Sequence, residues 1–549
     1  MSANLPLGAV EHSNGRVTFA LYAPGKRSVH LVGDFNGWNP GADPLHAGPD
    51  GRWWIEKPLP AGSYNYQFCV DGDLLICDPY ARELAEGAEH DPPRAIVTVG
   101  RPAYGWQHDD WSPPAFRDLV IMEIHVGDFT LQGNLQGVRD KLPYLRQLGI
   151  NAIELMPIYE FRGQEGWGYN PAYFFTVETS YGGPDEMRRL VDEAHECGIG
   201  VILDLVLAHT AHRHPFNRLY SYEQSPWYGP GCGKRNEFGF PSLDYTKGPT
   251  QQFTADVQDY WLKEFHVDGF RYDYCWGIGT KEEMGVPYLV KTARAVLPAA
   301  YLIAEYSPEA PKDVNRAGMD GAWHVLGRYQ LLALLREGTL NEHDWDDFEA
   351  VTGFLDPWQQ GYRQASQMIN FAESHDEQRL MCEVLEAGLD RAAAYRKSAL
   401  AATVLFTMPG EPMLFHGQEW GEATPRLTNE RNTLHWELLD TAEGAQLQAH
   451  YQQLAELRRR HPALRGEGFR LEALHPAQKT LVYRRWAGDG DAALVAVNFS
   501  PEAQEIPLPA DAETWEDLLA AGSSPSRATP AVTLPGSTAG VYVPRRSGR

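Results

Sequence analysis

Hydrophobic and polar positions alternate along the first hundred residues. In Arg16–Ala23, Ser28–Phe35 and Ser63–Val70, apolar residues recur at about every second position, and Asn36–Pro40 has the composition of a turn. A period of two indicates a strand with one buried face, because successive side chains point to opposite faces. Short strands separated by turns predict a β-sandwich over residues 1–100.

From about Leu119 the pattern changes to continuous apolar runs that alternate with amphipathic helical stretches. Such runs are typical of strands buried on both faces, and the helical stretches end at residues such as Gly149 and Gly198. The predicted strands are 119–126, 151–158, 200–209, 267–273, 300–306, 367–375 and 412–420. Alternating strands and helices over this length predict a (β/α)8 barrel with insertions at residues 117–465.

Two further segments complete the predicted organisation. Residues 101–116 are rich in proline and aromatic residues and are predicted to be a linker. Its large aromatic residues are Tyr104, Trp106, Trp111 and Phe116. Because a flexible tether would leave these rings in water, we expect the N-terminal module to pack on the barrel. Residues 466–549 return to a strand pattern, with a hairpin around 488–491, so the fold class is a multidomain α/β protein with a C-terminal antiparallel β domain, expected to be a β-sandwich.

Composition excludes several classes of function. The 549-residue chain has a formal net charge of −25, and an acidic surface repels nucleic acid and anionic membranes. Its six cysteines have no zinc-binding spacing, and no glycine-rich nucleotide-binding motif follows a strand. No secretory leader or membrane-length apolar run is visible. We therefore expect a cytoplasmic monomer or homodimer without a metal or a cofactor.

Polar residues gather where the predicted strands end, which is where a (β/α)8 barrel carries its active site. They are His125, Glu154, Asp204, His209, Arg271, Asp273, Glu305, His375 and Asp376. Alone, an Asp there is more often a helix cap, and a His is more often a satisfied hydrogen-bonding residue. Carboxylates that converge from separate strands are costly unless they have partners, and Arg271 supplies one. Since residues 271 and 273 are two apart, both side chains are expected to point into the lumen.

This set of residue types favours glycoside chemistry. An ionised aspartate attacks the anomeric carbon, a carboxylic acid protonates the leaving oxygen, and the covalent intermediate preserves the stereochemistry. An arginine keeps a neighbouring carboxylate ionised, whereas an apolar setting keeps a carboxyl group protonated. Asp273, close to Arg271, therefore fits the nucleophile, and Glu305 at the end of an apolar strand fits the acid.

Four ordered segments resemble the four signature regions of the α-amylase family, glycoside hydrolase family thirteen. They are Asp204–His209, Gly269–Asp273, Glu305 and Ser374–Asp376. Trp167–Pro171 is similar to the family's segment with a tyrosine beneath the sugar at the cleavage point. Gly33–Pro40 resembles the β-sandwich module before branching enzymes, isoamylases and trehalose-releasing hydrolases. In that module we expect Trp38, Trp53 and Trp54 to form the core and the domain interface rather than a sugar platform.

The resemblance implies a role for each matched position. It makes Asp273 the nucleophile, Glu305 the general acid/base and Asp376 the stabiliser of the distorted transition state. The other implied residues are Arg271, which orients the nucleophile, the sugar-binding Tyr169, His209 and His375, a stacking Trp276, and the supporting Asp204 and His125. Retaining enzymes hold their two carboxyl groups about 5–5.5 Å apart, which is the separation expected for Asp273 and Glu305.

Two positions depart from the family pattern. Ala208 stands where many secreted amylases have a calcium-binding Asn, and a hard cation needs six or more oxygen ligands. No calcium is therefore expected beside His209. Gly277 stands four residues after the nucleophile, where many amylases have a His, so contacts beyond the cleavage point are expected to differ. Its neighbour Trp276 fits a stacking role there and a core role equally well.

The expected reaction is retaining hydrolysis of α-1,4-glucans such as starch, glycogen and maltooligosaccharides. The alternatives are a 1,4-α-glucan branching enzyme and, next, a trehalohydrolase that acts on maltooligosyl trehalose. Ser374–Glu377 and the missing Asn favour branching enzymes, whereas Phe371–Met381 resembles bacterial proteins named α-amylases. An inactive glucan-binding barrel is disfavoured because Asp273, Glu305 and Asp376 are all present.

Overall fold

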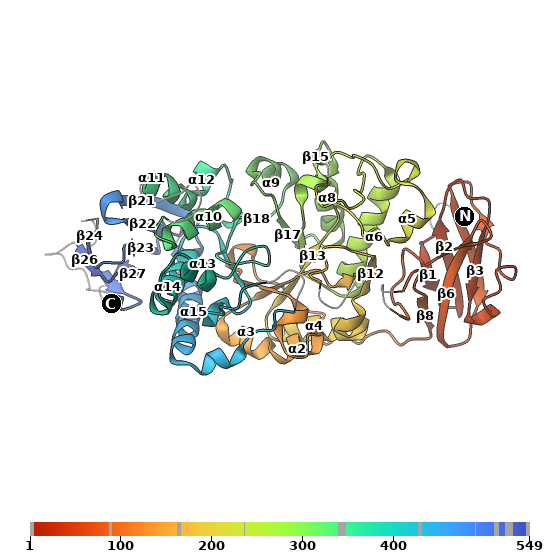
Figure 1. Cartoon of the computed structure of the whole chain (residues 1–549), viewed down its shortest axis with the longest axis horizontal. Helices are drawn as coiled ribbons and strands as arrows, with labels where there is room; N and C mark the ends of the chain where they lie inside the picture. The colour runs from red at the N-terminus through yellow and green to blue at the C-terminus, as the bar shows by residue number, and fades with distance from the viewer. Residues whose placement is uncertain are drawn as a thin grey trace.

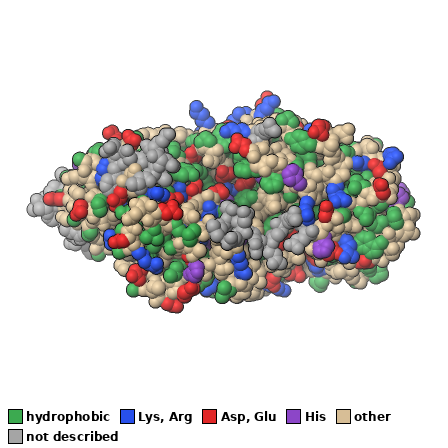
Figure 2. Space-filling model, viewed as in Figure 1, with side chains coloured by type: hydrophobic (Ala, Val, Ile, Leu, Met, Phe, Trp, Pro, Cys, Tyr) green, Lys and Arg blue, Asp and Glu red, His purple; other side chains and the backbone are tan. Residues whose placement is uncertain are grey.

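The computed structural model describes residues 5–86, 90–161, 166–234, 236–338, 347–426, 431–488, 490–509, 515–521 and 531–544. Three regions follow one another along the long axis of the molecule in Figure 1: the N-terminal sheets, a central barrel and the C-terminal sheets. Figure 2 shows acidic and basic side chains interspersed over this face of the molecule.

The N-terminal region consists of two antiparallel sheets with a shared core. One has the order β1-β2-β5-β4, and the other is formed by β3, β6, β7 and β8. The strands are β1 (Gly8–Glu11), β2 (Arg16–Tyr22), β3 (Val29–Gly33), β4 (His46–Ala47), β5 (Arg52–Pro58), β6 (Gly62–Val70), β7 (Leu74–Ile76) and β8 (Ala95–Val99). Phe19 and Tyr66 meet between the sheets, with ring centroids 5.0 Å apart. Of the three tryptophans considered for this core, Trp53 packs against it, whereas the half-buried Trp38 lies outside it and Trp54 contacts His46.

Eight parallel strands close the predicted barrel. In order they are β9 (Ile121–Ile124), β10 (Ala152–Leu155), β13 (Gly200–Leu205), β14 (Gly269–Tyr272), β17 (Tyr301–Ala304), β18 (Gly321–Trp323), β19 (Met368–Asn370) and β20 (Glu411–Phe415). Seven lie in predicted runs. The sequence pattern does not predict β18, because three residues are too few to show a period. Small sheets β11 (Tyr159–Glu160) with β12 (Tyr173–Val177), and β15 (Thr280–Lys281) with β16 (Met284–Gly285), lie in the connections.

Helices link the strands and cover the outside of the barrel (Figure 1). They are α1 (Val126–Phe129), α2 (Leu135–Asp140), α3 (Leu142–Leu148), α4 (Gly183–Glu196), α5 (Pro215–Leu219), α6 (Gly248–Glu264), α7 (Cys275–Ile278), α8 (Val286–Val296), α9 (Pro311–Ala317), α10 (Val325–Leu335), α11 (Phe348–Val351), α12 (Pro357–Gln360), α13 (Leu380–Glu386), α14 (Arg391–Thr407) and α15 (Ala442–Arg460). None of the described helices has the length and apolar composition needed to cross a membrane.

The C-terminal region is antiparallel, as predicted. Its main sheet has the order β21-β22-β23-β27-β25, and β24 pairs with β26. The strands are β21 (Gly468–His475), β22 (Thr480–Trp486), β23 (Ala492–Asn498), β24 (Gln504–Pro507), β25 (Trp515–Asp517), β26 (Ala531–Leu534) and β27 (Thr538–Pro544). The predicted hairpin is formed by β22 and β23.

The N-terminal module packs on the barrel, which confirms the expectation from the aromatic linker. The hydroxyl of Tyr80 donates to Asp256 of α6 at 2.9 Å, and its ring stacks on Phe175 with centroids 4.7 Å apart. In the linker, the indole N–H of Trp111 donates to Asp268 at 2.7 Å. These contacts bury aromatic surface against the barrel wall.

Deleting residues 1–100 is expected to harm solubility and stability more than affinity for long glucans. The deletion removes the partners of Phe175 and of Trp227, whose ring lies 5.7 Å from that of Tyr22. A melting temperature lower by at least roughly 5 °C is expected from the exposed apolar surface. A soluble barrel with an unchanged melting temperature that had lost only polysaccharide binding would contradict this prediction.

Candidate active site

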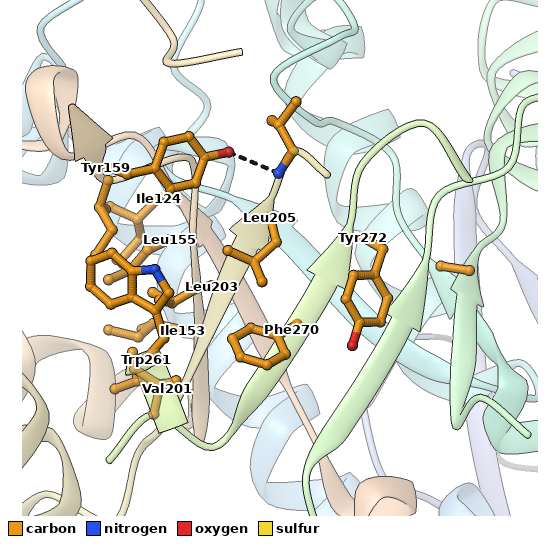
Figure 3. Close-up of a cluster of buried hydrophobic side chains, with 14 of the residues drawn as sticks. Ile124, Ile153, Leu155, Tyr159, Val201, Leu203, Leu205, Trp261, Phe270 and Tyr272 are labelled. Atoms are coloured by element: carbon orange, nitrogen blue, oxygen red, sulfur yellow. Dashed lines mark hydrogen bonds between the residues drawn. The ribbon is translucent and has the colours of Figure 1, made fainter. Parts of the chain in front are cut away.

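Barrel side chains alternate between the outer wall and the lumen. On β13, Val201, Leu203 and Leu205 belong to the outer core, which also contains Trp261 of α6 (Figure 3). A separate apolar cluster fills the base of the lumen and includes Ile121, Ala152, Ile202, Ile303, Ile369 and Met413. Two residues further along four of these strands come Glu123, Glu154, Asp204 and Glu305. The period of two therefore places a charged layer directly above an apolar one.

Arg271 lies at the centre of the charged layer and is completely buried. Its Nη1 donates to both carboxylate oxygens of Asp204 and to Oδ1 of Asp273, each at 2.9 Å. Its Nη2 lies 4.0 Å from Oε2 of Glu305. Carboxylates that follow one another along β13, β14 and β17 thus share a single guanidinium group.

Asp273 and Glu305 differ in their partners. Burial raises the pKa of both carboxyl groups, and Arg271 opposes this rise. The charge of Asp204 raises the pKa of Asp273 further, and that of Asp273 raises the pKa of Glu305. Arg271 is hydrogen-bonded to Asp273 but only approaches Glu305. Glu305 accepts the backbone N–H of Tyr274 at 2.6 Å. The closer cation favours ionisation of Asp273 more than ionisation of Glu305.

His375 connects a buried carboxylate to an open one. Its Nδ1 donates to Oε1 of Glu123 at 2.5 Å, and its backbone N–H donates to Oε2 at 3.0 Å. Its Nε2 lies 3.2 Å from Oδ1 of Asp376, whose side chain is 54% exposed. Burial opposes the charged form, but Asp376 and Glu123 raise the pKa of His375 to about 10. The resulting imidazolium holds the pKa of Asp376 well below its usual range, although burial acts in the opposite direction.

Tyr169 and His209 form the wall beside His375. The hydroxyl of Tyr169 donates to Asp204 at 2.5 Å, and its ring stacks on His375 with centroids 4.7 Å apart. His209 donates from Nε2 to the Tyr169 carbonyl at 2.9 Å and stacks on Phe240. Burial lowers the pKa of His209 to about 4, so this imidazole is neutral at neutral pH.

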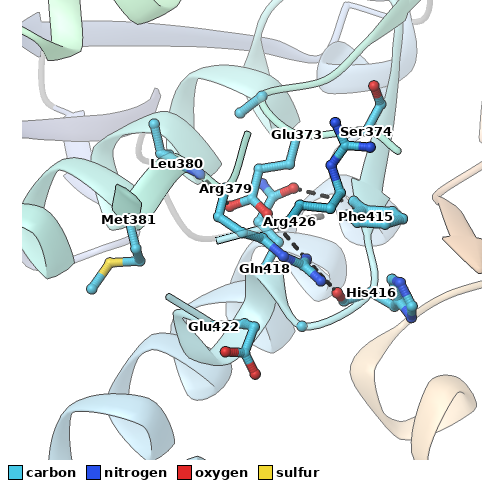
Figure 4. A network of polar contacts seen from close by, with 12 residues as sticks. Glu373, Ser374, Arg379, Leu380, Met381, Phe415, His416, Gln418, Glu422 and Arg426 are labelled. Atoms are coloured by element: carbon cyan, nitrogen blue, oxygen red, sulfur yellow. Dashed lines mark hydrogen bonds and ion pairs between the residues drawn. The ribbon is translucent and has the colours of Figure 1, made fainter. Parts of the chain in front are cut away.

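A buried ion pair closes the base of the loop that carries His375 and Asp376. Glu373 and Arg379, at the two ends of the loop, lie 3.3 Å apart between Oε2 and Nη1 (Figure 4). Arg379 also donates to the His416 carbonyl at 2.6 Å. Because Glu373 pairs with Arg379 and Arg379 bonds the residue directly after β20, the loop has a defined position above the lumen.

Two residues predicted for the site have other partners. His125 follows the end of β9 and caps α1; its ring bonds Asp128 at 2.7 Å and Tyr181 at 3.2 Å, not the central carboxylates. The strand alternation that directs Glu123 inward has ended there. The indole N–H of Trp276 donates to the Pro308 carbonyl, and the ammonium of Lys234 lies 4.1 Å from its ring centre.

Glu123 is a site residue that the strand-end analysis did not select. It is 1% exposed and lies in register with Glu154 on β10. The signal was present in the sequence, because Glu123 lies in the middle of an apolar run, two residues above Ile121 of the lumen layer. Glu123 lies at the same level of the barrel as the selected Glu154, but His125 was taken to represent its strand.

Activity is expected to survive exhaustive treatment with EDTA. Among the residues with a described position, no group of three or more His, Cys, Asp and Glu side chains is arranged to hold a metal. Beside His209, Ala208 has only a methyl group, and its carbonyl accepts the Leu243 N–H. The measurement is the hydrolysis rate after chelation and after adding back calcium or magnesium. A loss that calcium alone restores would refute the expectation.

A closed barrel whose lumen gathers three carboxyl groups around one arginine is typical of a (β/α)8 barrel enzyme. The sequence model for the alpha amylase catalytic domain matches residues 107–237 and 329–465. Carbohydrate-binding module 48, the isoamylase N-terminal domain, matches residues 6–81, and a domain of unknown function matches residues 469–541. Asp273 and Glu305 lie between the two matched catalytic ranges.

Relatives match over most of the chain. The malto-oligosyltrehalose trehalohydrolase of Arthrobacter ramosus is 30% identical over 462 residues, 74% of each chain. That of Rhizobium sp. (strain M-11) is 28% identical and aligns over 92% of this chain and 95% of its own. The 1,4-alpha-glucan branching enzyme of Oceanobacillus iheyensis is 27% identical, with 88% and 82% covered. The chain belongs to the α-amylase family.

Solved structures share the fold. The maltose complex of pullulanase type I from Bacillus subtilis superimposes with a TM-score of 0.84 at 21% identity, over 98% of this chain and 85% of that chain. The Paenibacillus barengoltzii pullulanase, complexed with maltohexaose and alpha-cyclodextrin, superimposes with a TM-score of 0.81 at 20% identity, over 98% and 95%. The three-part architecture is therefore shared with solved enzymes along almost the whole chain.

Proposed function

We propose that this chain is a retaining glycoside hydrolase that cleaves α-1,4 linkages in glucans through a covalent glycosyl-enzyme intermediate. The observation that carries the proposal is the unequal placement of Asp273 and Glu305 around Arg271. It supports an ionised nucleophile beside a protonated acid, which is the pairing that the reaction requires.

In the first step Asp273 attacks the anomeric carbon while Glu305 protonates the leaving oxygen. Glu305, now a carboxylate, then removes a proton from water, which attacks the same carbon and releases Asp273. Asp376 and the imidazolium of His375 are placed to bind sugar hydroxyls at the cleavage point, and Tyr169 and His209 form the wall of that site. Arg271 keeps Asp273 ionised and oriented, with Asp204 as its buried counterion.

Trehalose release is a second candidate, because the Rhizobium trehalohydrolase aligns over 95% of its own length. Chain transfer is a third, since the aligned branching enzyme of Oceanobacillus iheyensis is also covered over 82%. All three reactions begin with the same displacement by Asp273. Trehalose release differs in its leaving group, which is trehalose, and chain transfer differs in its acceptor, which is a sugar hydroxyl rather than water. The six unpaired cysteines support a reducing, cytoplasmic location, and we propose a monomer or homodimer.

Product analysis on amylose, maltooligosaccharides and maltooligosyl trehalose tests the proposal. Hydrolysis predicts new reducing ends on maltooligosaccharides, whose anomeric proton signal at early times is that of the α form. Free trehalose would establish trehalose release instead, and new α-1,6 branches would establish chain transfer. An initial β product would exclude retention, and no product from any of these glucans would favour a barrel that only binds.

Replacing Glu123 with Gln is expected to lower kcat/KM about 10- to 100-fold at neutral pH. The change removes one of the two carboxylates that raise the pKa of His375 to about 10. The imidazolium is the form present below its pKa, so a lower pKa removes the charge as pH rises. The ratio of wild-type to variant activity should therefore increase between pH 6 and pH 9.

Glu154→Gln is the matched control for this prediction. Burial and the neighbouring Glu123 raise the pKa of Glu154 well above its usual range, so it is a neutral acid that resembles an amide. Neither of its oxygens has a hydrogen-bond partner among the described residues. The Glu154→Gln variant should therefore differ from the wild-type activity by less than about threefold at any pH. A Glu123→Gln loss that did not vary with pH would assign Glu123 a packing role only.

A further inference from the structure

Two loops meet closely in the segment that follows Asp273. The N–H of Lys234 donates to the Trp276 carbonyl at 2.7 Å, which joins the loop before Phe240 to the segment after Asp273. The contact requires glycine, because a Cβ on Gly233 would lie 1.8 Å from the Gly277 carbonyl oxygen. The sequence thus specifies a close approach of these two loops beside the catalytic carboxyl groups.

Tyr274 directly follows Asp273 in a left-handed backbone conformation, with φ 44° and ψ 56°. This conformation is unfavourable for a tyrosine, and such strain concentrates at functional sites. It lets the backbone N–H reach Glu305 at 2.6 Å. A Cβ on Gly277 would lie 2.3 Å from Cδ1 of Tyr274, so the tyrosine ring occupies the space that a side chain at 277 would need.

Phe238 extends this aromatic surface toward solvent. Its ring packs edge-on against Tyr274, with centroids 5.4 Å apart and an interplanar angle of 78°. Phe238 is 65% exposed, and an exposed large apolar side chain beside a catalytic pair indicates a binding surface. Trp276 is less available, because Lys234 covers one of its faces.

We propose that Phe238 and Tyr274 bind the glucosyl unit on the leaving-group side of the cleaved bond. The side follows from Glu305: the acid must contact the leaving oxygen, and Tyr274 is hydrogen-bonded to that acid. His375 and Tyr169, whose rings stack on each other, belong to other loops around the lumen opening. The apolar C–H face of a pyranose ring matches an exposed phenyl ring, and its hydroxyl groups remain in water. This inference rests on the proposed function.

The test compares two substrates with different leaving groups. Maltohexaose places a sugar there, whereas α-maltotriosyl fluoride places only fluoride, which leaves without a proton. Phe238→Ala should lower kcat/KM at least about tenfold on maltohexaose, because it removes apolar contact area. Its rate on the fluoride should change less than about twofold, and Phe238→Tyr should restore the rate on maltohexaose.

Trp358→Ala is the matched control, because Trp358 of α12 is also exposed, at 43%, but lies in another part of the fold. It should leave both rates unchanged. Gly277→Ala should reproduce the selective loss, since the added methyl group displaces the Tyr274 ring. Equal losses on both substrates, or no loss on maltohexaose, would overturn the inference. Failure of the wild-type protein to act on either substrate would instead overturn the proposed function.

Discussion

Asp273→Asn is expected to reduce turnover of maltooligosaccharides by at least about four orders of magnitude. The amide has nearly the shape of the carboxylate but cannot form the glycosyl-enzyme bond. It also cannot offer Arg271 a negative charge, although Asp204 still does so through two hydrogen bonds. The measurement is the initial rate of reducing-sugar release, with the melting temperature and glucan affinity determined on the same preparation.

Fold and binding should be nearly intact in this variant, because Asp273 contributes little packing and the other lumen residues keep their partners. A variant that retained a tenth of wild-type activity would remove Asp273 from the role of nucleophile. A large fall in melting temperature would show that the pair with Arg271 supports the fold as well as the chemistry. In that case Arg271→Lys, which keeps a positive charge, should retain a larger share of the wild-type stability than of the wild-type activity.

Glu305→Gln is expected to reduce turnover of maltooligosaccharides by about three orders of magnitude or more, because it removes both the acid and the base. The loss should depend on the leaving group, since α-maltotriosyl fluoride needs no proton in the first step. The glycosyl-enzyme should then accumulate on Asp273, because no base activates water. Azide attacks the glycosyl-enzyme without the help of a base. Added azide should therefore restore turnover of the fluoride and form the α-glycosyl azide.

The anomeric configuration of the azide product reports on the stereochemistry of the reaction as well as on the role of Glu305. An α product means two displacements at the same carbon, as the proposed retaining mechanism requires. A β product would mean direct attack by azide on the fluoride, without an intermediate on Asp273. In the wild-type protein, kcat/KM on maltooligosaccharides should fall as pH rises through the raised pKa of Glu305, since only the protonated acid serves the first step.

Local patterns were sufficient for the architecture because barrel strands are buried on both faces. The run at 200–209 is apolar throughout except for Asp204 and the terminal His209, and this contrast identified both the strand and its inward acid. The same reasoning missed β18, whose three residues carry no periodic signal. It also missed Glu123, although this residue lies at the same level of the barrel as the chosen Glu154, because His125 was taken to represent the strand.

The tertiary structure was needed wherever a role depends on partners from distant segments. His125 and Glu123 are two residues apart, yet the turn into α1 directs His125 to Asp128 and Tyr181. Glu123 instead contacts His375, which is distant in the sequence. Sequence spacing cannot show this, because alternation ends where the strand ends and the helix begins.

By itself, the sequence determined the barrel, the flanking β domains and the family, since these depend on periodicity and on short ordered motifs. Only the tertiary structure decided how protons and charges are distributed, because a pKa depends on burial and on the few ångströms that separate Arg271 from Asp273 and Glu305. It also decided that the Tyr274 ring fills the space left by Gly277, since that contact depends on backbone angles that residue types do not specify.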